Sequence, residues 1–284
     1  MNEPAHNSAT DTVNAMRHQL TVLIDRRSLE LPPMPGVAAE VIASSLDDHA
    51  DAARLARLIE TDQGLTGHVL RIVNSPALRA ATEIVALRQA IGRLGMNRIR
   101  EIALAAALSN SLFAQSCYPI EAKRAWQRAL CAGLWAKEIA RVCRKNTEMS
   151  YLCGLLHNVG TPVVLNALGR GPMSHLAEAD LESLVTEFGA CAGTLLARDW
   201  KLPEAVVATV RFIDDFAAAA EHADHVAIAN CAMNFARLME RSDVPLESIG
   251  ALESIRHLNL YPDDVATLLN MRDAVRTSIE SIAA

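Results

Sequence analysis

The sequence predicts an all-α fold, on the strength of three observations. Apolar residues make up 51% of the 284 residues but aromatic residues only 4%, so most of the apolar content is alanine, leucine, valine and isoleucine. These residues recur at steps of three and four, the spacing of one helical face. No segment shows the sustained apolar–polar alternation of a half-buried strand. Small apolar side chains let helices approach closely, so helix-on-helix packing is the expected architecture.

The first two segments precede the main body of the chain. Residues 1–28 are predicted to be a frayed polar tail and then a helix, which begins near Asp11. The stripe that supports this helix consists of Val13, Met16, Leu20 and Leu23. The segment LELPPMPG at 29–36 is predicted to be an extended strap, because its three prolines interrupt helical hydrogen bonding.

The rest of the chain is predicted to be a series of helices. Asp51 is a suitable N-cap for one of them, because its side chain can accept a hydrogen bond from a free amide of the first turn. The predicted ranges are 37–46, 51–61, 64–74, 84–94, 96–113, 120–144, 175–187, 189–199, 203–212, 221–240 and 262–282.

The segment YLCGLLHNVGTP at 151–162 predicts a buried helix that ends in a tight reversal. Gly160 is expected to cap this helix at its C-terminus, and Thr161-Pro162 to begin the next one. His157 and Asn158 would then lie on the last turn of the buried helix.

The overall charge and the cysteines limit the class of protein. With 27 basic and 33 acidic residues the formal net charge is −6, which disfavours a general nucleic-acid coat. The six cysteines include no C-x-x-C pair, and the polar N-terminus does not resemble a secretory leader. We therefore expect a cytoplasmic protein with reduced cysteines. The uncharged run at 102–120 contains Ser, Asn, Gln and Pro, so it predicts a core helix and not a membrane span.

Several ordered blocks together resemble the HDOD family, the HD-related output domains of bacterial signalling proteins. The blocks are LPPMPGVAAEVI, LARLIETDQGLTGHVLRIVNSP, LRQAIGRLGMNRIREIALAAAL, YLCGLLHNVG and EFGACAGTLLARDWKLPEAVV, and the match spans about 29–212. The resemblance implies a two-lobed helical fold, related to metal-dependent HD phosphohydrolases. The implied domain is 29–240, with lobes at 29–115 and 116–240 and a C-terminal helical extension at 241–284.

The same resemblance implies a degenerate metal site. Where HD enzymes carry an adjacent His-Asp pair, this chain has His157-Asn158, and an amide is a poor substitute for a carboxylate that anchors a divalent metal. Arg128 stands near the position of an earlier histidine, and Cys191 where relatives often carry another. We therefore expect no metal, no cofactor and no catalysis. An Asn158→Asp change should be tolerated in stability if Arg128 is the neighbouring cation.

Other interpretations of these residues remain open. His157 can be a structural core histidine, a metal ligand, or a contact for a bound ligand. His222 and His225 lie three apart in EHADH and are a candidate weak metal pair, although a solvated helix start explains them too. The arginines of one basic stretch form a candidate contact surface: Arg88, Arg93, Arg98 and Arg100.

The leading functional hypothesis is a non-catalytic bacterial signal-transduction module that binds a signalling protein or a small ligand. Receiver, PAS or cyclic-di-GMP-related proteins are the expected partners, and no membrane association is expected. The sequence contains no P-loop, Rossmann, serine-hydrolase or zincin motif. One alternative is a residual metal-dependent phosphohydrolase acting on a nucleotide. The other is a DNA-contacting regulator that uses 53–74 as a helix-turn-helix, with His68 and Arg71 on the second helix.

Overall fold

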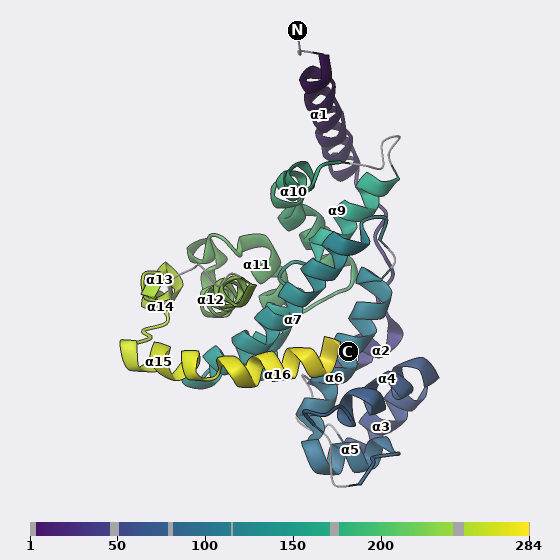
Figure 1. The fold of residues 1–284 in the computed structure, drawn as a ribbon, viewed down its shortest axis with the longest axis vertical. Helices are drawn as coiled ribbons and strands as arrows, with labels where there is room; N and C mark the ends of the chain where they lie inside the picture. Colours follow the sequence, from purple (N-terminus) through teal and green to yellow (C-terminus); the bar gives the residue numbers. More distant parts are fainter. Residues whose placement is uncertain are drawn as a thin grey trace.

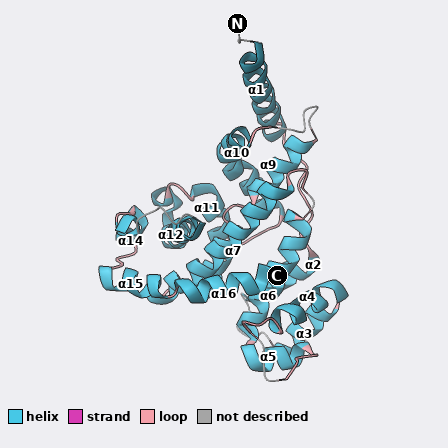
Figure 2. Cartoon of the chain, viewed as in Figure 1, coloured by secondary structure: helices cyan, strands magenta, loops and turns pink. Residues whose placement is uncertain are grey.

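A computed structural model describes residues 4–45, 51–78, 82–114, 116–170, 176–240 and 247–283. Helices make up all the regular structure of these ranges, without a strand, which confirms the all-α prediction (Figures 1 and 2). The N-terminal part comprises α1 (Pro4–Asp25), α2 (Gly36–Ser45), α3 (Ala52–Glu60), α4 (Gln63–Val73), α5 (Leu87–Leu94), α6 (Met96–Leu108) and the π-helical turn η1 (Ser109–Phe113).

The second group of helices is built around the long helix α7. It comprises α7 (Pro119–Val142), α8 (Thr147–Leu156), α9 (Gly160–Gly169), α10 (Glu178–Asp199), α11 (Glu204–Phe212), the 3-10 turn η2 (Phe216–His222) and α12 (Ala223–Glu240). One face of α7 carries alanines, and it packs against α8 and α12. Gly154 of α8 is required here, because a Cβ at this position would collide with the carbonyl oxygen of Ala132.

The C-terminal helices return to the junction of the two groups. They are α13 (Glu247–Gly250), α14 (Glu253–His257), α15 (Pro262–Asn270) and α16 (Arg272–Ala283). α14 packs on α12, α15 on α7, and α16 lies across both α6 and α7 (Figure 1). The predicted single helix at 262–282 is therefore two helices, which meet at Met271.

Local capping explains several helix boundaries. The Asp51 side chain accepts a hydrogen bond from Ala53 N at 3.1 Å, as the sequence predicts. Pro119 occupies the first turn of α7, where its missing amide hydrogen costs nothing. The predicted strap is non-helical up to Gly36, and Trp200 fixes it by donating from Nε1 to the carbonyl of Pro32 at 2.9 Å.

Two predicted boundaries are wrong for a tertiary reason. Gly160 does not cap α8 but begins α9, and a Cβ on it would overlap the Gly189 carbonyl oxygen. The break predicted between 187 and 189 is absent, because α10 continues through this contact with α9. The glycines thus permit close packing of α9 on α10 and do not end a helix.

A buried ionic cluster, the Glu101 cluster, joins three helices. Glu101 of α6 is 7% exposed and accepts hydrogen bonds from Arg98 at 3.1 Å and from Lys137 of α7 at 2.5 Å. The hydroxyl of Tyr151 in α8 donates to the Glu101 carbonyl oxygen at 3.1 Å. The cluster therefore ties α6, from the N-terminal group of helices, to α7 and α8.

Helix α1 projects from the rest of the molecule (Figure 1). Its later turns pack on α9 and α10, where Met16 and Leu20 are buried. Arg17 Nε donates to Glu187 Oε2 of α10 at 2.7 Å. Both the apolar contacts and this ion pair attach α1 to α10.

One segment, Thr147–Gly169, has the length and composition of a membrane span, since an 18-residue window of it has a mean hydropathy of 1.2. The segment comprises α8 and α9, and 72% of that window is buried inside the protein. Such burial is what a core segment of a folded domain shows. The run at 102–120, which the sequence predicts to be a core helix, begins in α6, whose residues from Ile99 to Leu108 are all buried as well.

Candidate functional site

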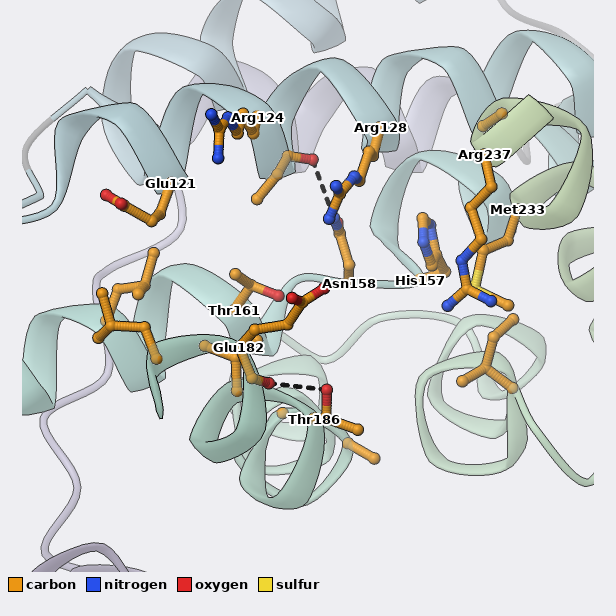
Figure 3. A pocket seen from close by; sticks show the side chains of 18 of the residues that line it. Glu121, Arg124, Arg128, His157, Asn158, Thr161, Glu182, Thr186, Met233 and Arg237 are labelled. Carbon is orange, nitrogen blue, oxygen red and sulfur yellow. Dashed lines mark hydrogen bonds between the residues drawn. The ribbon is translucent and has the colours of Figure 1, made fainter. Parts of the chain in front are cut away.

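A cavity of about 290 Å³ lies between α7, α9, α10, α11 and α12 (Figure 3). The turn between α8 and α9 forms part of its lining and contributes His157 and Asn158. Its apolar walls are formed by Leu165, Leu181, Val185, Val210, Ile213 and Met233. The charged side chains that line it are Glu121, Arg124, Arg128, Glu178, Glu182, Asp214 and Arg237.

His157 is a buried, neutral imidazole of defined tautomer. It directly follows α8, and its Nδ1 lies 2.7 Å from the Gly154 carbonyl oxygen. A carbonyl can only accept, so Nδ1 carries the hydrogen and Nε2 is an acceptor. Burial, and then the charge of Arg237, lower the pKa of His157 to about 4 against the raising effects of the Gly154 bond and Asp214. His157 therefore lacks a positive charge at neutral pH.

Asn158 uses its two amide atoms differently. Nδ2 donates to the Ala125 carbonyl oxygen of α7 at 2.9 Å. Oδ1 is buried, and no described residue donates to it. A carboxylate could not make the bond to Ala125, because it would place an oxygen against an oxygen. The amide is therefore a structural requirement of this turn.

The arginines that line the cavity differ in their pairing. Arg128 points its side chain toward the cavity, but its Nε is bound to both carboxylate oxygens of Glu240, at 2.8 and 3.0 Å (Figure 3). Arg124 pairs with Glu178. Neither ion pair nor hydrogen bond joins the Arg237 side chain to another residue of the described ranges. Arg128 is therefore not the dedicated cation beside Asn158 on which tolerance of Asn158→Asp would depend, and that expectation loses its basis.

The residues of the cavity do not fit a divalent metal ion. Within the described ranges, no three or more His, Cys, Asp or Glu side chains come together as metal ligands would. Asn158, in place of the carboxylate, already spends its donor on the backbone of α7 and offers one neutral oxygen. A hard cation needs several converging oxygen or nitrogen ligands, several of them charged.

Cys191 is exposed on α10 and is not part of the lining. Because α10 is one continuous helix, Gly189 and Ala190 face the cavity while Cys191 is turned about 100° further round the helix. The expected equivalence of Cys191 with a metal-site histidine therefore does not place its thiol at the site.

His222 and His225 do not share a regular helical face. η2 ends at His222, after a non-helical Ala220 (φ 50°, ψ −120°), and His225 lies in α12. The acid between them, Asp224, is bound elsewhere: it accepts from Lys145 at 2.6 Å and pairs with His257 of α14 at 3.0 Å. These contacts tie the C-terminal helices to α12 and engage Asp224 away from the two histidines, whereas the other acid of EHADH, Glu221, lies 3.6 Å from His222 Nε2.

The four arginines of the proposed contact surface do not form one surface. Arg88 and Arg93 are exposed on α5. Arg98 belongs to the Glu101 cluster, and Arg100 is 6% exposed, with Nη1 bound to Asn97 at 3.1 Å. The reason is the register of α6, which directs these two side chains toward α7 and α8.

The segment proposed as a helix-turn-helix forms α3 and α4, but its second helix serves the core. Leu65, Val69 and Ile72 of α4 are buried. Nε2 of His68 is also buried, and burial lowers the pKa of this histidine below its usual value. Of the two side chains expected to contact DNA, only Arg71 is exposed.

Sequence reasoning missed six of the seven charged residues of the cavity, which are Glu121, Arg124, Glu178, Glu182, Asp214 and Arg237. Asp214 lies only two residues beyond position 212, where the resemblance to the family ends, so the matched blocks stop just short of it. Nothing in the sequence around Glu182 or Arg237 distinguishes them from solvated helix residues.

Comparison with known proteins places this architecture. The protein-family model "HDOD domain" matches residues 31–216. A Treponema pallidum (strain Nichols) protein, named only as uncharacterized, is 26% identical over 233 residues. The match covers 76% of this chain but 45% of the relative, so the chain spans about half of that protein's length.

Solved structures share the fold. An HDOD domain protein of unknown function from Geobacter sulfurreducens matches with a TM-score of 0.76 at 24% identity, covering 93% of this chain and 98% of the other. A Shewanella amazonensis SB2B protein with the provisional name of metal-dependent phosphohydrolase gives a TM-score of 0.70 at 21% identity, covering 95% and 98%. The family match over most of the chain, on a helical frame with these relatives, shows that this protein belongs to the HDOD domain family.

Proposed function

We propose that this protein is a non-catalytic, cytoplasmic signal-transduction module, which acts by binding and not by hydrolysis. The observation that carries the proposal is the hydrogen bond from Asn158 Nδ2 to the Ala125 carbonyl oxygen. It builds an amide into the turn where a phosphohydrolase of related fold needs a metal-binding carboxylate.

The electrostatics of the cavity support the same conclusion. Metal-assisted hydrolysis requires a divalent ion that activates water and neutralises charge on phosphorus. His157 offers one acceptor nitrogen, and Asp214, on the segment after α11, offers one carboxylate. As the only ligands, these two side chains would leave a metal under-coordinated. Family membership supports the signalling role, and a receiver, PAS or cyclic-di-GMP-related protein is the partner we propose.

The alternative, a residual phosphohydrolase, is favoured by one observation: His157 and Asp214 still line a common cavity. A hydrolysis assay separates the two functions. The purified protein is incubated with Mn²⁺ or Mg²⁺ and either bis(p-nitrophenyl) phosphate or a cyclic dinucleotide. We expect no metal-dependent release of product from wild-type protein or from Asn158→Asp. Saturable, metal-dependent hydrolysis that is abolished by His157→Ala would overturn the proposal.

A further inference from the structure

The polar atoms that the turn between α8 and α9 leaves without a described protein partner are hydrogen-bond acceptors. Asn158 Oδ1 is a buried acceptor, and no described residue donates to it. His157 Nε2 is also an acceptor, because Nδ1 donates to Gly154, and no described residue donates to Nε2 either. Buried polar atoms are normally hydrogen-bonded, so the unpartnered Asn158 Oδ1, with the acceptor Nε2 on the adjacent His157, calls for a hydrogen-bond donor in the cavity.

The charges around the cavity disfavour an ionised group at this turn. Arg124 and Arg128 are paired with carboxylates, and His157 is neutral. The other charged side chains of the lining are of both signs, with carboxylates at Glu121, Glu182 and Asp214 and the guanidinium of Arg237, so an ion of either sign would meet like charge as well as opposite charge. An anion would in addition face the two acceptors, and burying an ion without a net gain of opposite charge is costly. The donor that the turn calls for is therefore an uncharged N–H or O–H group.

Arg237 supplies a hydrogen-bond donor to the same cavity. Its guanidinium projects from α12 beside His157 and Met233 (Figure 3), and no other residue of the described ranges pairs with it. A guanidinium only donates hydrogen bonds, so it is complementary to a carbonyl oxygen. Between these polar groups the walls are largely apolar, and a cavity of about 290 Å³ has room for a small ring.

We propose that the cavity binds a small, flat, uncharged ring with adjacent N–H and C=O groups, the lactam pattern. The N–H donates to Asn158 Oδ1 or His157 Nε2, the C=O accepts from Arg237, and the ring packs against Val210, Ile213 and Met233. This inference rests on the proposed binding role, since it assigns the ligand class of the same cavity.

The test uses 2-pyridone as the probe and N-methyl-2-pyridone as its matched control. The two rings differ only in the N–H, which the methyl group replaces. In titration calorimetry we expect 2-pyridone to bind with a Kd on the order of 1 mM, since a ligand this small has few contacts. N-methyl-2-pyridone should bind at least about tenfold more weakly, the equivalent of one lost hydrogen bond to a buried acceptor.

Two variants locate the binding. Arg237→Gln should weaken 2-pyridone binding about fivefold or more by removing a charged donor, whereas Arg198→Gln should leave it unchanged. Arg198 is the matched control because it is exposed on α10 and does not line the cavity. The ¹⁵N signal of His157 Nε2 should shift on titration with 2-pyridone and not with its N-methyl analogue.

Several results would overturn the inference. They are equal binding of both rings, equal effects of the two arginine variants, or no binding of 2-pyridone at all. Binding of inorganic phosphate in its place, lost in Arg237→Gln, would make the cavity an anion site and would also overturn it. None of these results affects the hydrolysis assay, so failure of the ligand class is distinguishable from failure of the non-catalytic role.

Discussion

The Glu101 cluster and the cavity at His157 are both polar regions inside an aliphatic helical protein, but they differ in how their groups are satisfied. Around Glu101, each charge meets an opposite charge, and Tyr151 completes the set. Around His157, Asn158 Oδ1 has no donor and Arg237 has no acceptor among the described residues. The satisfied groups of the Glu101 cluster brace the helices, whereas the buried Asn158 Oδ1 and the exposed Arg237 beside the cavity are available to a ligand.

The largest expected effect comes from breaking the Glu101 cluster. Glu101→Ala leaves Arg98 and Lys137 mostly buried without their anion, and we expect the free energy of unfolding to fall by about 3–5 kcal/mol. Urea denaturation measures this loss. The control is Arg128→Gln, which breaks a half-exposed pair and should cost at most about 1 kcal/mol. Equal losses in the two variants would show that burial does not distinguish these regions.

The next effect is a pH dependence that originates at His157. Folding lowers its pKa from an ordinary 6.5 to about 4. Between these values the unfolded chain binds more protons, so the contribution to stability is full above pH 6.5 and is lost as the pH falls toward 4. We expect about 2 kcal/mol less stability at pH 5 than at pH 7 from this group.

The measurement compares urea unfolding of wild type and His157→Gln at the two pH values. The variant lacks the titrating ring, so its stability should fall less between pH 7 and pH 5. If both proteins lost the same stability over this range, His157 would not be the buried neutral group described above.

A smaller loss of stability is expected from substitution of Asn158, which tests whether the donor atom or the acceptor atom of its amide stabilises the fold. Asn158→Asp removes the donor to Ala125 and puts a carboxylate oxygen against a carbonyl, which should cost about 1–3 kcal/mol. The matched control is Asn97→Asp, because Asn97 accepts from Arg100 through Oδ1, an atom that aspartate retains. Thermal denaturation should show a lower Tm for Asn158→Asp only. A loss in the Asn97 variant alone would reverse this interpretation.

Features of the fold that depend on residues close together in the sequence could be predicted from it. Asp51 caps α3 through its own first turn, and Pro119 begins α7 because of its ring geometry. The prediction for Gly160 failed because its reason is contact with Gly189, which lies 29 positions later in the chain, and local turn chemistry does not reveal it.

The same distinction applies to the site. The identity of His157 and Asn158 and their place at a buried helix end were visible in the sequence, since both follow from one segment. The pairing of Arg128 with Glu240 joins residues 112 positions apart, and the position of Cys191 depends on the continuity of α10. Burial of Arg100 likewise depends on how α6 packs, which periodicity alone does not determine.

The attachment of α1 to α10 has a mechanical consequence. α10 carries Glu187 on the side held by Arg17, and the preceding residues Val185 and Thr186 line the cavity. At 22 residues, α1 is about 33 Å long. Val185, Thr186 and Glu187 are consecutive residues of α10, so the residue that holds α1 and the residues that line the cavity belong to the same turn of one helix. Any movement of this turn therefore alters both the attachment of α1 and the wall of the cavity.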